Sequence, residues 1–250
     1  MEFADHFSEH AASYRQYRPG YPAGLYDWLC GLVPSRRLAW DAGTGNGQAA
    51  LDLAARFERV VATDPSERQI AEATAHPRIG YGIAAETNPA LKDASVDLVT
   101  AAQAMHWFDL DRFFAEVARV LRAGGVIAAW TYHRSVVSDA VDRVTDRFRV
   151  ETMGPFWPPG REYVEDEYRT IPFPFRRLEA PRFEVRERWT ARRFLAYLDT
   201  WSAVRRCRKA TGEDPLRALE PELVAAWGGM DVERDVRFPL AILAGRTEEA

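Results

Sequence analysis

The sequence predicts an α/β fold built on a doubly wound, mostly parallel sheet. Of its 250 residues, 47% are hydrophobic, which is enough to fill one large core. Short apolar runs alternate with segments of helical periodicity between residues 38 and 132. Because parallel strands need crossover connections, this alternation indicates helices on both faces of the sheet. We expect strands at 38–41, 59–63, 79–83, 96–101 and 125–132, with helices at 47–57, 66–75 and 109–122.

The segments on either side of this core predict helical caps. Pro22 suits the first turn of an N-terminal helix, which Pro34 would end. After Tyr132 the alternation of strands and helices is lost. The remaining pattern predicts helices at 136–151, 191–208 and 215–227 and strands at 183–190 and 235–244. Pro239 removes a ladder donor from the last strand, so we expect irregular pairing there.

Composition and charge exclude several classes of protein. The 33 basic and 37 acidic residues give a formal net charge of −4, too small for a disordered chain of this hydrophobicity. No run approaches the roughly 20 apolar residues of a membrane-spanning helix, and the first residues lack the features of a secretory signal. We therefore expect a cytoplasmic protein. Cys30 and Cys207 lie far apart and outside any metal-ligand spacing, so neither a metal site nor a disulfide framework is predicted.

Basic residues are concentrated in one part of the chain. Residues 176–209 contain eleven Arg and Lys residues against four Asp and Glu residues, a net charge of +7. This basic segment could be a face of solvated arginines or a surface that attracts anions.

The sharpest motif is a glycine-rich loop between the first strand and the next helix. It reads Asp-Ala-Gly-Thr-Gly-Asn-Gly over residues 41–47. Its glycines permit a tight turn and the close approach of a ligand to the backbone. A phosphate-binding Walker loop needs a lysine that is absent here, and the glycine spacing differs from the Gly-x-Gly-x-x-Gly of dinucleotide sites. The loop therefore predicts a nucleotide-like ligand of another kind.

Two acidic residues narrow the choice of ligand. Asp41 stands just before the glycines, where its charge disfavours a phosphate and suits an ammonium or sulfonium group. S-Adenosylmethionine carries both groups. Asp64 ends the second strand, 21 residues after Gly43, and can accept hydrogen bonds from both hydroxyls of a ribose. NAD is the competing ligand, and ordinary turns with a capping Asp are the alternative that binds nothing.

Several segments occur in the order of a known family. They are 14–22, 41–47, Asp64, Ala85-Glu86, 95–99, 102–108 and 120–125. On these segments the sequence resembles the class I S-adenosylmethionine-dependent methyltransferases, and more narrowly the small-molecule subgroup that includes trans-aconitate methyltransferase-like proteins (methyltransferase type 11 domain). The resemblance implies a Rossmann-like, seven-stranded sheet whose last strand is antiparallel, with 183–190 and 235–244 as the last two strands. It implies S-adenosylmethionine as cofactor and S-adenosylhomocysteine as product.

The resemblance also implies cofactor contacts. Gly43 and Gly45 would line the methionine part, and Asp64 would bind the ribose. Many relatives place an Asp near the adenine where this chain has Ala84, so Ala85 or Glu86 would replace it.

Two further segments complete the predicted cofactor site. Gln103 follows the fourth strand at the same edge of the sheet. Tyr14, Tyr17 and Arg18 could close the site from the N-terminal segment, with Arg18 on the methionine carboxylate. The alternative for this segment is a packed group of aromatic rings with a surface arginine.

The segment after the fourth strand should face the methyl group. It lacks both the Asn/Asp-Pro-Pro-Tyr/Phe of base amino methyltransferases and a nucleophilic cysteine in a Pro-Cys setting. His106 is the candidate catalytic residue, as a general base or as a group that orients the acceptor. The alternative is that His106 and Trp107 only pack against the next helix. Trp107, Trp157 and Trp201 are expected to form the walls of a substrate pocket, and arginines within 192–208 would suit a carboxylate.

We expect methyl transfer to a small acceptor, at the oxygen of a carboxylate or hydroxyl. The rivals are an RNA or tRNA methyltransferase that uses the basic segment, a non-catalytic S-adenosylmethionine-binding module, and an NAD-linked oxidoreductase. We expect no nucleic acid or membrane partner, and a monomer or homodimer. Residues 1–250 should form one methyltransferase domain, with an N-terminal helical cap (1–34), a cofactor-binding core (35–132), a cap or lid excursion (133–181), and the last two strands with inserted helices (182–250).

Overall fold

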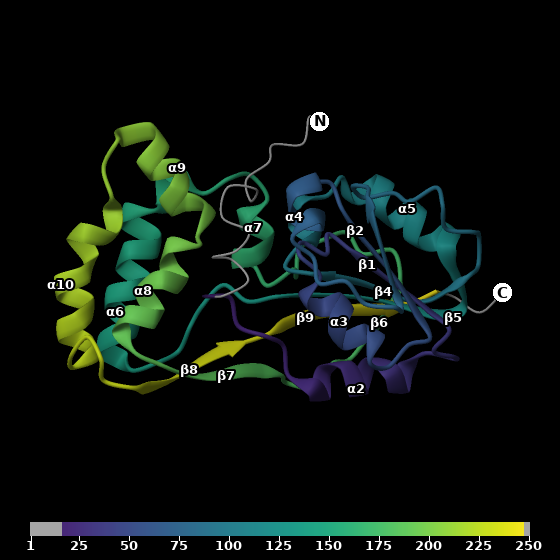
Figure 1. The fold of residues 1–250 in the computed structure, drawn as a ribbon, viewed down its shortest axis with the longest axis horizontal. Coiled ribbons are helices and arrows are strands. Elements are labelled where there is room, and N and C mark those ends of the chain that lie inside the picture. Colours follow the sequence, from purple (N-terminus) through teal and green to yellow (C-terminus); the bar gives the residue numbers. More distant parts are fainter. Residues whose placement is uncertain (1–16, 248–250) are drawn as a thin grey trace.

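The computed structural model, which describes residues 17–247, contains a seven-stranded sheet with the order β3-β2-β1-β4-β5-β9-β6 (Figure 1). Strands β1 to β5 pair in parallel, and β9 runs antiparallel to both of its neighbours. This confirms the predicted doubly wound, mostly parallel sheet. The strands are β1 (Leu38–Ala42), β2 (Arg59–Asp64), β3 (Ile79–Ile83), β4 (Val96–Ala102), β5 (Leu121–Thr131), β6 (Arg176–Leu178) and β9 (Ala241–Arg246).

Helices cover both faces of this sheet because neighbouring strand residues point to opposite sides. On one face, Ala39 and Leu98 pack with the apolar sides of α2 (Ala23–Leu32) and α3 (Gln48–Ala54). On the other face, Trp40 and Val99 pack with α5 (Leu110–Val120), whose Asp109 caps its first turn. The short helix α4 (Glu67–Ala71) follows β2, and the 3-10 turn η2 (Met105–Trp107) follows β4. The carboxyl ends of β1, β2 and β4 therefore open into loops at one edge.

Residues 139–239, apart from β6, form a region that we call the cap, and it has a hydrophobic core of its own. Trp189, Phe194 and Trp227 are buried in it, away from the two cores on the sheet. Figure 1 shows α6, α8, α9 and α10 grouped beside the sheet, with α7 between these helices and the sheet. The elements of this region are α6 (Asp139–Arg147), the π-helical turn η3 (Phe148–Thr152), the 3-10 turn η4 (Gly154–Phe156), α7 (Arg161–Glu165), β7 (Glu184–Trp189), α8 (Ala191–Asp199), α9 (Ser202–Thr211), α10 (Pro215–Trp227) and β8 (Arg234–Pro239).

Two predicted strands do not pair as expected from the sequence. Residues 183–190 do not join the main sheet, because β7 pairs with β8 in a separate two-stranded sheet. The seventh strand of the main sheet is β6, three residues long and unpredicted. The predicted strand 235–244 is two strands: β8 ends at Pro239, and β9 begins two residues later in the other sheet. The irregular pairing predicted at Pro239 is confirmed as the point where the chain changes sheets.

The predicted helix 191–208 is also divided. It forms α8 and α9, with a break at Thr200 and Trp201. The Thr200 hydroxyl donates to the Tyr197 carbonyl at 2.6 Å and so satisfies an oxygen at the end of α8. This break brings Trp201 and Ser202 to the side of the cap that faces the sheet.

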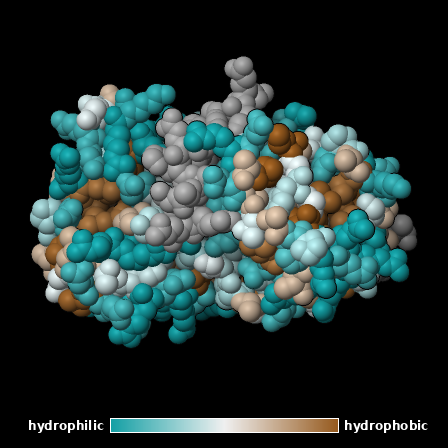
Figure 2. Space-filling model, viewed as in Figure 1, coloured by the Kyte–Doolittle hydropathy of each residue, from teal (hydrophilic) through white to brown (hydrophobic). Residues whose placement is uncertain are grey.

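The surface carries small apolar patches among hydrophilic residues, as Figure 2 shows for one face. Among residues 17–247, the large hydrophobic residues that stay exposed are Ile83, Val150 and Val232. Within residues 17–247, no helix combines the length and the apolar character that crossing a bilayer requires.

Candidate active site

The glycine loop joins β1 to α3, and its shape requires its glycines. Gly43, Gly45 and Gly47 have φ angles of 67°, 56° and 88°, in the left-handed region. A Cβ at Gly43 would lie 2.5 Å from the Cβ of Ala104, so the loop packs directly on the segment after β4. A Cβ at Gly45 would meet nothing closer than the Gln69 side chain at 3.9 Å. The loop therefore exposes bare backbone at Gly45 to a ligand.

Asp41 supports this loop from the protein interior. Its carboxylate has no exposed surface, and its two oxygens each accept a 2.6 Å hydrogen bond, one from the Thr44 hydroxyl and one from the Thr100 hydroxyl. Thr44 belongs to the loop and Thr100 to β4, so Asp41 joins the two elements. Burial raises the pKa of Asp41 from 3.8 to about 6, against the effect of these hydrogen bonds. In this geometry Asp41 positions the loop, and the ligand contact that the sequence predicts for it stays a prediction.

Asp64 lies at the end of β2 beside the loop. Its Oδ2 accepts the Gly45 N–H at 2.8 Å, and its Oδ1 accepts the Ser66 N–H at 2.9 Å. The Asp64 side chain is half-buried, and a carboxylate has about four acceptor positions, so it is a suitable acceptor for ribose hydroxyls. Ile83, the partner of Asp64 across β2 and β3, is 61% exposed. A carboxylate beside an exposed apolar side chain fits the ribose and base of an adenosine group.

The other predicted cofactor residues have partners within the protein. Glu86 forms an ion pair with Arg112 at 2.9 Å, and Ala85 is half-buried beside it. Gln103 accepts the Thr131 hydroxyl at 2.7 Å and donates to the Tyr132 carbonyl at 3.1 Å, so it ties the end of β4 to the end of β5. Tyr14 lies outside the described residues.

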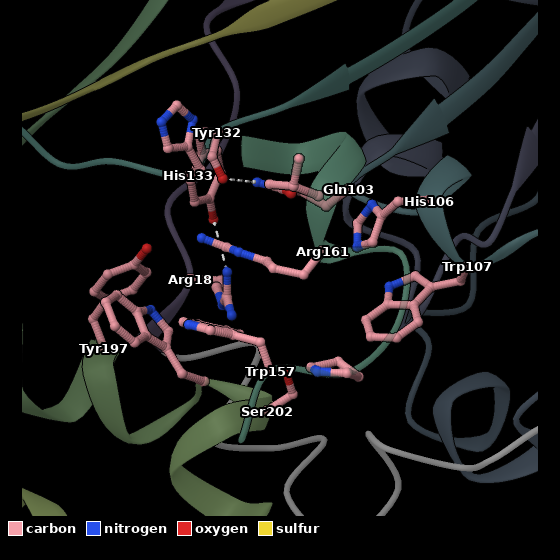
Figure 3. Close-up of a pocket in the computed structure, with 13 residues that line it drawn as sticks. Arg18, Gln103, His106, Trp107, Tyr132, His133, Trp157, Arg161, Tyr197 and Ser202 are labelled. Atoms are coloured by element: carbon pink, nitrogen blue, oxygen red, sulfur yellow. Dashed lines mark hydrogen bonds between the residues drawn. The ribbon is translucent and has the colours of Figure 1, made fainter. Parts of the chain in front are cut away.

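A pocket of about 60 Å³ opens between the end of the sheet and the cap (Figure 3). It receives side chains from the N-terminal segment, from η2, from the end of β5, and from α7, α8 and α9. Within the described residues 17–247, the lining of this pocket contains no acidic side chain. The lining residues are Arg18, Gln103, His106, Trp107, Tyr132, His133, Trp157, Pro158, Arg161, Val164, Tyr197, Trp201 and Ser202.

Two arginines supply the positive charge of this pocket. Arg18 donates to the Thr200 hydroxyl at 3.0 Å, and its guanidinium lies 5.3 Å from the centre of the Tyr197 ring. Arg161 lies over the Trp157 ring at 4.1 Å. Figure 3 shows both guanidinium groups pointing into the middle of the pocket. Aromatic side chains of the cap therefore hold two fixed, planar hydrogen-bond donors there.

The acids near this pair do not cancel its charge. Glu165 pairs with Arg161 at 2.8 Å and with Arg149 at 2.6 Å, so one carboxylate serves two arginines. Asp146 also reaches Arg149 at 3.4 Å, but it is shared with Arg134 at 3.7 Å. Counted over residues 17–247, the pocket and its immediate surroundings keep an excess of positive charge, which attracts an anion.

His106 lines the same pocket and is neutral. Burial, together with the nearby charges of Arg161 and Arg18, lowers its pKa from 6.5 to about 3. Its Nδ1 lies 2.9 Å from the Tyr168 hydroxyl, and its ring lies 4.8 Å from that of Trp107. An imidazole held neutral so strongly can orient a ligand, but it is a weak proton acceptor.

The structure brings the three predicted tryptophans together. Trp107, Trp157 and Trp201 all line the pocket, with 5.3 Å between the ring centres of Trp157 and Trp201.

The basic segment 176–209, in contrast, supplies no arginine to the pocket. Several of its arginines pair with carboxylates or lie on rings, as Arg192 does with Asp231 and Arg193 with Trp189. The pocket therefore does not use the arginines within 192–208, and their role toward a carboxylate stays a prediction.

Sequence reasoning missed Arg161, Tyr168 and Ile83. Arg161 stands in no recognisable motif and reaches the pocket only because α7 crosses from the cap to the sheet. Tyr168 lies in a segment without periodicity. Ile83 could have been found, since it ends a strand next to the one that carries Asp64.

Comparison with known proteins agrees with this fold and loop. A family model described as a methyltransferase domain matches residues 40–129. A methyltransferase-named protein from Dictyostelium discoideum is 32% identical over 254 residues, which cover 99% of this chain and 97% of that protein. An uncharacterized methyltransferase from Mycobacterium tuberculosis is 40% identical over 121 residues, covering 48% of this chain and 49% of that one. A solved structure from Anaeromyxobacter dehalogenans, described as a type II methyltransferase, has a TM-score of 0.86 and 51% identity, with 94% of this chain and 100% of that chain covered.

These findings define the class of protein: an enzyme that transfers a methyl group from S-adenosylmethionine on a Rossmann-like sheet. The chain belongs to the class I S-adenosylmethionine-dependent methyltransferase family.

Proposed function

We propose that this enzyme methylates a carboxylate oxygen of a small acceptor and so forms a methyl ester. The observation that carries the proposal is the pair Arg18 and Arg161 in one pocket whose described lining holds no acidic residue. A guanidinium matches a carboxylate with two parallel hydrogen bonds, which gives geometric as well as electrostatic selectivity. A carboxylate acceptor also agrees with the resemblance of the sequence to the trans-aconitate methyltransferase-like subgroup.

The cofactor would lie across the carboxyl ends of β1 and β2. S-Adenosylmethionine supplies a methyl group already activated on a sulfonium centre. Asp64 would accept the ribose hydroxyls, Ile83 would contact the base, and the backbone around Gly43 and Gly45 would face the methionine part. Gly43 packs on Ala104, two residues before His106, so loop and pocket share one wall.

His106 favours a carboxylate over a hydroxyl acceptor. A hydroxyl usually needs a base to remove its proton, whereas a carboxylate is already ionised near neutral pH. With its pKa lowered to about 3, His106 is poorly suited to that task. The protein would act mainly by aligning the two reactants and excluding water, which can lower the barrier by about 7–11 kcal/mol. The rings of Trp107, Trp157 and Trp201 supply the apolar walls for this.

A transfer assay with methyl-labelled S-adenosylmethionine tests the proposal. Deproteinised metabolites and purified RNA would be offered separately as acceptors. We expect label in the metabolite fraction and none in RNA. Label in RNA alone would contradict the proposal, and an absence of turnover with intact S-adenosylhomocysteine binding would indicate a non-catalytic module.

A further inference from the structure

Tyr168 holds His106 from a distant part of the chain. Its hydroxyl lies 2.9 Å from Nδ1 of the imidazole, 62 residues earlier. Tyr168 is 1% exposed, so its hydroxyl proton needs a protein acceptor. The other side chain that interacts with this hydroxyl is Thr131, whose own proton goes to Gln103. An imidazole nitrogen is a far stronger base than an alcohol oxygen, so Nδ1 is the preferred acceptor.

The backbone around Tyr168 is constrained to make this contact. Glu167 and Tyr168 have φ angles of 56° and 62°, two consecutive left-handed residues that are not glycine. The Tyr168 N–H donates to the Tyr163 carbonyl at 2.8 Å, which closes the turn after α7. At the other end of α7, a Cβ on Gly160 would collide with the His106 carbonyl oxygen. The segment from Gly160 to Tyr168 therefore contacts His106 of η2 at both of its ends.

We propose that Tyr168 is a positioning residue that donates to Nδ1 of His106 and fixes the tautomer with hydrogen on Nε2. His106 then presents a hydrogen-bond donor to the pocket beside the guanidiniums of Arg18 and Arg161. The role of this donor rests on the proposed function, because three converging donors suit the carboxylate of the acceptor. His106 orients that carboxylate and removes no proton.

The tautomer can be measured on the free enzyme by nitrogen NMR of protein labelled with ¹⁵N-histidine. The His106 signals would be assigned by their loss in the His106→Gln variant. We expect a protonated Nε2 and an unprotonated Nδ1 in the wild type. The reverse tautomer, in which Nδ1 donates to Tyr168 and Tyr168 donates to Thr131, would overturn the proposal.

A matched pair of variants then tests the role of Tyr168 itself. Tyr168→Phe removes the donated hydrogen bond and should give a mixture of both tautomers. Tyr163→Phe is the control, since it lies on the same short helix and has no hydrogen bond to His106. An unchanged tautomer in Tyr168→Phe would sink the positioning role. Should Tyr168→Phe fail to fold, the wild-type spectrum still decides the tautomer.

Kinetics with the acceptor found in the transfer assay separate a donor from a base. His106→Gln keeps an N–H donor, so kcat/KM should stay within about 10-fold of the wild type. His106→Leu has no side-chain donor, so its kcat/KM should fall about 100-fold, mainly through a higher KM. Equal losses in the two variants would contradict the donor role. Because the NMR experiment needs no acceptor, a failure to find a methyl ester would count against the proposed function and not against the tautomer.

Discussion

The two halves of the proposed active site differ in how far apart their residues lie in the sequence. The cofactor half comes from loops that follow two neighbouring strands, and residues 41–64 hold its central groups. The acceptor half is formed by residues from four separate segments: Arg18, His106, Arg161 and Trp201. The hydrogen bond from Arg18 to Thr200, for example, joins residues 182 positions apart. A local motif therefore defines the cofactor, whereas the acceptor pocket depends on long-range packing.

The two halves also differ in charge. Asp64 stands at the proposed cofactor half, and Arg18 and Arg161 line the pocket proposed for the acceptor. In the proposed reaction, the acidic side would receive the sulfonium cofactor and the basic side the carboxylate acceptor. Opposite fields on the two sides would favour each reactant in its own place.

The largest expected effect concerns the buried carboxylate behind the cofactor loop. Because the pKa of Asp41 is raised from 3.8 to about 6 on folding, this group destabilises the protein as pH rises from about 4 to about 6. The shift corresponds to about 3 kcal/mol in the free energy of unfolding. Asp41→Asn removes it, so the variant should gain about that much relative to the wild type between pH 4 and 7.

Urea unfolding of both proteins across this pH range measures the difference. The difference between the two proteins removes the contribution of the other carboxylates to the pH dependence. Glu165 is one of these, and its lowered pKa makes the protein more stable as pH rises. A difference that does not change with pH would contradict the role of Asp41.

The second prediction removes the hydrogen bonds of the cofactor half. Asp64→Ala takes away the acceptor for ribose and the partner of the Gly45 N–H. We expect about a 100-fold weaker affinity for S-adenosylhomocysteine by calorimetry. Asp93→Ala, at an exposed aspartate paired with Arg119, is the control and should bind normally. Normal affinity in Asp64→Ala would show that the cofactor lies elsewhere.

The third prediction concerns the shape of the loop. Gly43→Ala would force a Cβ into Ala104 at a positive φ, which should lower the free energy of unfolding by about 2 kcal/mol. Gly31 lies in α2 with open space around it, so Gly31→Ala should raise stability by about 0.5–1 kcal/mol. Denaturant titration of both variants checks the contrast, and equal effects would mean that the loop tolerates a side chain.

The smallest expected effect isolates the acceptor half. Arg161→Met should raise the KM for the acceptor about 10-fold and leave affinity for S-adenosylhomocysteine unchanged. Arg192→Met removes an exposed arginine of the basic segment and should change neither quantity. A similar rise in KM in both variants would indicate that the acceptor binds at the basic segment instead.

The sequence predicted the parts of the fold that depend on neighbouring residues. The first five strands, the glycine loop and the placement of His106 after β4 follow from periodicity and local motifs. Strand β6 could not be predicted, because Arg176, Arg177 and Leu178 show no apolar alternation and their partner strand, β9, lies more than 60 residues later. Strand β7 shows that alternation but cannot reveal its partner, since pairing is a long-range choice.

The acceptor pocket was harder to predict for the same reason. Net charge pointed to the basic segment, yet the pocket uses Arg161, whose guanidinium is held by Trp157 and Glu165. Those contacts arise from α7 and its neighbouring turns, and no spacing in the sequence distinguishes Arg161 from other arginines.

The alkali lability of the labelled product tests the central claim most directly. A methyl ester is hydrolysed by mild base and releases labelled methanol, whereas a methyl ether or a methylated amine does not. After transfer from methyl-labelled S-adenosylmethionine to the metabolite fraction, we expect most of the label to become volatile on treatment with base, and Arg161→Met to yield less of it. Label that stays in the non-volatile fraction would contradict methylation of a carboxylate.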